Sequence, residues 1–139
     1  MRSAPIWARV HAGLGGSTGA GLVFVYGFAW LVDGAPDEGL VPGVNELLIV
    51  KAIIVGIGAI ALAVGAMIGR PAVIVGGCWL FIADFALFLV LCGITADRPH
   101  EPLADTGSPS IPAEIILTAL VIGVVFPSLT MWLANRTPR

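Results

Sequence analysis

Asp84 is the residue whose position most strongly indicates chemistry. It is the fourteenth residue of a 26-residue stretch, 71–96, that carries no other formal charge. An ionised carboxylate near the middle of a membrane helix costs at least about 2.5–3.5 kcal/mol. Such a side chain needs a partner, a water-filled cavity or a bound proton. We keep two interpretations open: a proton, cation, cofactor or subunit contact, and a structural carboxyl held by hydrogen bonds.

Lys51 is the second charged residue inside an apolar stretch. It follows Glu46 by five residues, which places it roughly 8 Å below the outer surface. Counted from Asp97, Asp84 lies roughly 20 Å deep, so the two differ by about 12 Å along the helix axes. That gap is longer than a lysine side chain. We therefore expect Lys51 to extend outward to the membrane surface, whereas a direct Lys51–Asp84 salt bridge would require tilted or offset helices.

His11 lies at the start of the first apolar stretch, where a histidine can ligate haem or copper or relay protons. The other histidine, His100, belongs to a loop on the opposite side, so the two cannot hold one haem within this chain. No cofactor is predicted, and contact with haem or quinone would require partner subunits. We expect His11 to lie near the lipid headgroups.

The loop that contains His100 also carries three carboxylates, but their spacing fits no defined metal site, and no metal is predicted. These carboxylates are Asp97, Glu101 and Asp105. The sequence contains no paired-cysteine motif, nucleophile elbow or phosphate-binding loop. Catalytic activity is therefore not expected. The pattern His11-x-x-x-Gly15-Gly16, with Lys51 early in the next apolar stretch, is similar to small bacterial membrane families of the copper-resistance D type. The resemblance covers a handful of positions in half the chain, so copper handling is not carried over.

The amino-acid composition indicates the class of protein in which these residues lie. Of the 139 residues, 58% are apolar and only 12% are charged, and the mean hydropathy is +0.98. A globule of this size cannot hide so much apolar surface, which excludes a water-soluble fold. The same hydrophobicity excludes disorder. The net charge of −2 and the lack of a basic cluster argue against nucleic-acid binding.

Charged residues divide the chain into four apolar stretches, each long enough to cross a bilayer as a helix. We predict an all-α polytopic membrane protein, with four transmembrane helices in an up-down bundle that forms one membrane domain over residues 1–139. The predicted helices are 8–32, 46–69, 71–95 and 112–134, with outward loops at about 33–45 and 96–111. The first stretch should be retained, because its uncharged run of 23 residues is too long for a signal peptide.

The arginines predict the orientation of this bundle. Five of the six fall on one side of a chain that crosses four times. These are Arg2, Arg9, Arg70, Arg136 and Arg139. The positive-inside rule therefore places both termini in the cytoplasm. An integral protein of a bacterial plasma (inner) membrane fits the arginine-rich composition.

Small residues spaced four apart predict close packing between helices. Such patterns occur in three of the four stretches. They indicate either contacts between helices of this bundle or contacts with the helices of a partner chain. The candidate packing residues are Gly13, Ser17, Gly21, Ala61, Gly65, Gly69, Gly77, Ala119 and Gly123. Pro127 lies inside the fourth stretch and should kink it.

Two functions fit these observations. The first is a small non-catalytic subunit of a larger membrane complex, such as a respiratory or other energy-transducing complex, with the lipid bilayer and other membrane subunits as partners. The lack of a catalytic set and the many-sided small-residue surface of the first stretch favour this function. The alternative is a small proton- or cation-coupled transporter or channel that uses Asp84.

Overall fold

The computed structural model describes residues 3–33, 44–96 and 113–136, and they contain helices and no strands. The helices are α1 (Ile6–Asp33), α2 (Val44–Ile68), α3 (Pro71–Ala96) and a fourth helix in three consecutive parts. These parts are α4 (Ala113–Leu120), the π-helical turn η1 (Val121–Val125) and α5 (Phe126–Asn135). The all-helical prediction is confirmed, and each helix ends within two residues of its predicted bounds. Except at their ends, the predicted outward loops lie outside the described residues.

Three of these helices are long and apolar enough to cross a membrane: Glu46–Ile68, Pro71–Gly93 and Ala113–Asn135. Large apolar side chains on their outer faces are exposed, including Ile60 and Met67. Such surfaces are expected where the surrounding solvent is lipid. α1 is not among the three, and its first half is rich in glycine, serine and threonine.

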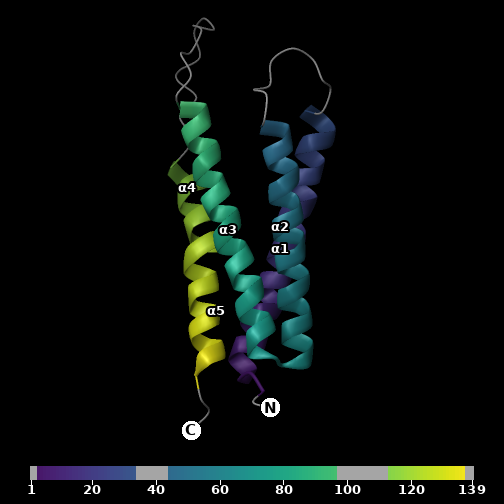
Figure 1. Ribbon diagram of the computed structural model, residues 1–139, viewed down its shortest axis with the longest axis vertical. Helices are drawn as coiled ribbons and strands as arrows, with labels where there is room; N and C mark the ends of the chain where they lie inside the picture. The colour runs from purple at the N-terminus through teal and green to yellow at the C-terminus, as the bar shows by residue number, and fades with distance from the viewer. Residues whose placement is uncertain (1–2, 34–43, 97–112, 137–139) are drawn as a thin grey trace, which may run out of the picture.

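The connection between α2 and α3 is a tight turn (Figure 1). Gly69 adopts φ 68°, the left-handed conformation that commonly ends a helix and that glycine adopts without strain. Pro71 then begins α3, a position where the missing N–H is not needed. Arg9 of α1 satisfies carbonyls at the end of α2, because its Nε donates to Ala66 at 2.7 Å and its Nη2 to Met67 at 3.1 Å.

The bundle is closely packed on the turn side of residues 19, 51, 84 and 123. We call this part the hairpin half, and it comprises residues 3–19, 51–84 and 123–136. Small residues let the helices approach here: a Cβ built on Gly16 would lie 3.1 Å from the Ala59 carbonyl oxygen. A Cβ on Gly77 would lie 2.8 Å from Leu62 Cγ.

The rest of the bundle is open. We call residues 20–33, 44–50, 85–96 and 113–122 the open half. The structure describes the exposure of most of these residues, and each of those is exposed or half-buried. No residue of α4 is buried. Figure 1 shows α2 and α3 joined at the turn and separated at their other ends, with α1 following α2. The divergence in this half is therefore between α2 and α3.

The fourth helix is irregular just before Pro127. Phe126 N–H bonds to the Val121 carbonyl, which makes one π-helical turn, and Thr130 Oγ1 donates to the Phe126 carbonyl at 2.9 Å. Proline cannot donate a backbone hydrogen bond, so the bonding pattern shifts next to it. The turn places Gly123 against Phe85, where a Cβ would lie 2.5 Å from Phe85 Cβ. Only glycine fits at this contact without a shift.

A buried ion pair on the floor of an apolar cavity

Lys51 of α2 and Asp84 of α3 form a buried salt bridge. Lys51 Nζ donates to Asp84 Oδ1 at 2.7 Å and to the Asp84 backbone carbonyl at 2.9 Å. The ammonium also lies 5.5 Å from the Tyr26 ring centroid and 5.8 Å from that of Phe88. Both rings attract a cation through their electron-rich faces. The lysine charge is therefore balanced by one carboxylate and supported by a carbonyl and two aromatic rings.

The expectation that Lys51 extends outward to the membrane surface is wrong. The error arose because depth was counted from the loops at the far ends of the helices. Counted from the tight turn, Lys51 lies 18 residues before Gly69 and Asp84 lies 14 residues after Arg70. The difference of four residues is about 6 Å along the axes, which a four-carbon side chain can bridge. The turn sets the register of the two helices.

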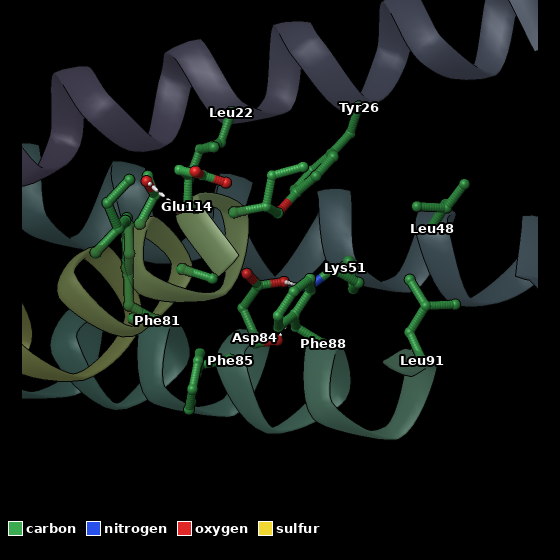
Figure 2. A pocket seen from close by; sticks show the side chains of 15 residues that line it. Leu22, Tyr26, Leu48, Lys51, Phe81, Asp84, Phe85, Phe88, Leu91 and Glu114 are labelled. Carbon is green, nitrogen blue, oxygen red and sulfur yellow. Dashed lines mark hydrogen bonds and ion pairs between the residues drawn. The ribbon is translucent and has the colours of Figure 1, made fainter. Parts of the chain in front are cut away.

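A cavity of about 400 Å³ lies beside this pair. Its wall is almost entirely apolar and comes from all four helices, and Figure 2 shows the side chains that line it. Cavities of this size hold small organic ligands. Phe81, Phe85 and Phe88 contribute aromatic surface from α3, and Tyr26 does so from α1. The cavity lies where the helices begin to diverge, so the ion pair lies at the boundary between the two halves.

Three polar residues that the sequence analysis did not place in a site also line this cavity: Tyr26, Glu114 and Thr118. Tyr26 of α1 and Glu114 of α4 reach it from elements that do not carry the ion pair (Figure 2). Tyr26 is the only tyrosine of the chain. None of these positions has a sequence signal of its own, because a place on the cavity wall depends on how the four helices are arranged in space.

His11 lies away from this site. Its ring stacks on Phe126 with centroids 5.6 Å apart, and its buried Nδ1 has no hydrogen-bond partner. Among the described residues, no group of three histidines, cysteines or carboxylates can hold a metal ion. The arrangement therefore offers charge pairing and an apolar cavity.

The predicted packing residues fall into two groups. Gly65, Gly77 and Gly123 face neighbouring helices closely, Gly69 forms the turn, and Ala119 lines the cavity. Ala61 is half-buried. In contrast, Gly13 and Gly21 have no neighbour within 4 Å of a built Cβ, and Ser17 is exposed and donates to the Gly13 carbonyl of its own helix. The face of α1 that packs against α2 instead uses Gly16 and Gly19.

Comparisons of the chain with protein-family models, curated proteins and solved structures gave no match.

Proposed function

We propose that this chain is a small ion-coupled membrane transporter in which the Lys51–Asp84 pair couples a proton or cation to an occupant of the cavity. One observation carries the proposal: a salt bridge with both side chains nearly buried lines a cavity of about 400 Å³. Ionisable groups within membrane helices cost free energy, so they are rare and typically belong to ion pathways or proton relays.

The location of the pair provides a coupling mechanism. Lys51 and Asp84 connect α2 to α3 at the level where the two helices begin to diverge. A proton on Asp84 would remove its negative charge and leave the lysine cation buried without a counter-ion. Removing one partner of a buried pair costs several kcal/mol, so protonation favours a different arrangement of α2 and α3. Binding of an occupant that prefers one of these arrangements is then coupled to binding of the proton. The coupling is reciprocal, because the proton changes the affinity for the occupant by the same factor as the occupant changes the affinity for the proton.

The orientation and the number of crossings belong to the same proposal. α1 packs along α2 over much of its length, and we propose that it is the fourth crossing. Arg9, Arg70 and Arg136 all lie at the hairpin end of the bundle. The positive-inside rule supports a cytoplasmic hairpin end, with both termini on that side of a bacterial inner membrane. The open half then faces outward.

Purified protein in liposomes tests this function. We expect a proton or monovalent-cation flux under an imposed membrane potential, with Asp84→Asn reducing it at least tenfold. Asp84→Glu keeps a titratable carboxylate and should retain measurable flux. Glu46→Gln removes an exposed carboxylate that does not line the cavity and should leave the flux unchanged. Absence of flux from folded wild-type protein, or equal flux from Asp84→Asn, contradicts the proposal.

A subunit role is the second candidate, and a different observation favours it. Gly13, Ser17 and Gly21 form a small-residue face on α1 that points away from the other described helices. Such a face permits close approach of a helix from another membrane subunit. Stoichiometric co-purification of other membrane chains after gentle detergent extraction, lost in Gly13→Leu and retained in Gly76→Leu, supports this role. Gly76 provides a control because it also has no neighbour within 4 Å of a built Cβ.

A further inference from the structure

We infer that the occupant of the cavity is a lipophilic organic cation, a molecule with a bulky apolar or aromatic body and one positive charge. The inference rests on the proposed function because it names the substrate class of the same site. Three features of the cavity carry it: the apolar wall, the net charge of its lining residues, and the aromatic rings.

The apolar wall selects the body of the ligand. Almost all of the surface that lines the cavity is carbon, and the cavity lies at the level where the helices separate. A small, strongly hydrated ion would lose its water there without enough polar groups to replace it. A molecule whose charge is spread over or shielded by apolar groups has a much smaller dehydration cost.

The charges select the sign of the ligand. Among the described residues, the charged ones that line the cavity are Lys51, Asp84 and Glu114, and their formal sum is −1. Lys51 is fully engaged with Asp84, and only 2% of its side chain is exposed, against 13% for Asp84. The pair therefore presents its carboxylate to the cavity more than its ammonium. Of the cavity-lining residues that the structure describes, none is a cationic partner of Glu114. An entering anion would meet two carboxylates.

The aromatic rings favour the same sign. Tyr26, Phe81, Phe85 and Phe88 come from α1 and α3 and line the cavity on facing sides (Figure 2). The face of an aromatic ring attracts cations, most strongly where water is excluded. Two of these rings, Tyr26 and Phe88, already lie near the Lys51 ammonium. These two rings therefore already show the kind of contact with a positive charge that an organic cation in the cavity would make.

Glu114 also has a structural role that any experiment must separate from ligand binding. It lies in the first turn of α4, where a carboxylate is favoured by the helix dipole. Glu46 has the same place in the first turn of α2, is exposed, and does not line the cavity. Glu46→Gln is therefore the matched control for Glu114→Gln, because both variants lose the same dipole contribution.

Binding of tetraphenylphosphonium and tetraphenylborate to the purified full chain tests the inference. The two probes have the same shape and nearly the same size but opposite charge. Calorimetric titrations are made in detergent micelles, and Ala119→Phe, which fills the cavity from α4, defines binding outside it. We expect saturable binding of tetraphenylphosphonium that Ala119→Phe abolishes. Glu114→Gln should weaken this binding about tenfold, while Glu46→Gln leaves it unchanged.

The remaining outcomes separate this inference from the proposed function. Binding of tetraphenylborate to the cavity as tightly as tetraphenylphosphonium, or equal affinities in Glu114→Gln and wild type, overturns the inference. If Asp84-dependent flux is measured in liposomes and tetraphenylphosphonium does not bind, the inference fails and the transporter proposal stands. If tetraphenylphosphonium binds as expected but no flux occurs, the cation site stands and the transporter proposal fails.

Discussion

The hairpin half and the open half of this bundle are built from the same four helices but differ in the size of the residues between them. In the hairpin half, Gly16, Gly65 and Gly77 bring backbones close together. In the open half, the larger side chains of Tyr26 and Phe88 line the cavity between the helices. Every residue of this half whose exposure is described is exposed or half-buried. The difference shows how one bundle can contain both a closely packed base and an apolar cavity, with an ion pair at the boundary.

Substitution of Lys51 should produce the largest effect on stability, because this buried side chain joins α2 to α3 at the boundary between the two halves. Lys51→Met leaves the Asp84 carboxylate buried without its counter-ion. We expect the free energy of unfolding in micelles to fall by about 3–5 kcal/mol. Measurement is by denaturant titration followed by tryptophan fluorescence. A loss below about 1 kcal/mol is typical of an exposed ion pair. Such a small loss would contradict the description of Lys51–Asp84 as a buried pair at the boundary between the two halves.

Two adjacent glycines of α3 test the close packing of the hairpin half. A Cβ on Gly77 would meet Leu62 at 2.8 Å, whereas a Cβ on Gly76 has no neighbour within 4 Å. Gly77→Leu should therefore lower the free energy of unfolding by about 1–3 kcal/mol through overpacking. Gly76→Leu changes helix propensity equally and should have no such cost. Similar losses of stability in both variants would show that the hairpin half is less tightly packed than described.

Arg9 should have the smallest of the three effects. Its two hydrogen bonds join α1 to the end of α2, at 2.7 and 3.1 Å. Arg9→Lys keeps the positive charge but loses the planar two-donor geometry. We expect a loss of about 1 kcal/mol in the free energy of unfolding. Arg9→Gln also removes the charge and should lose more. Unchanged stability in both variants would mean that the two Arg9 hydrogen bonds do not help to hold α1 at the turn, where Ala4 N–H also donates to the Gly69 carbonyl.

Much of this fold follows from the sequence, because its determinants are local. Charges and prolines mark the helix ends, and Gly69 and Pro71 mark the turn. The Lys51–Asp84 contact was misjudged because the axial register was measured from the wrong end, although residue counts from the turn were already sufficient. In contrast, the places of Tyr26 and Glu114 depend on how the four helices are arranged around the cavity. No residue spacing within one helix contains that information.

The most direct test of the account is the distance between Lys51 Nζ and the Asp84 carboxyl in lipid bilayers. Lys51 is the only lysine of the chain, so ¹⁵N-lysine gives a single side-chain signal in solid-state NMR. With ¹³C-aspartate, the account predicts a strong ¹⁵Nζ–¹³Cγ dipolar coupling, as required by the 2.7 Å contact with Oδ1. The coupling should disappear in Asp84→Asn. A lysine signal without coupling to any aspartate in the wild-type protein would contradict the account.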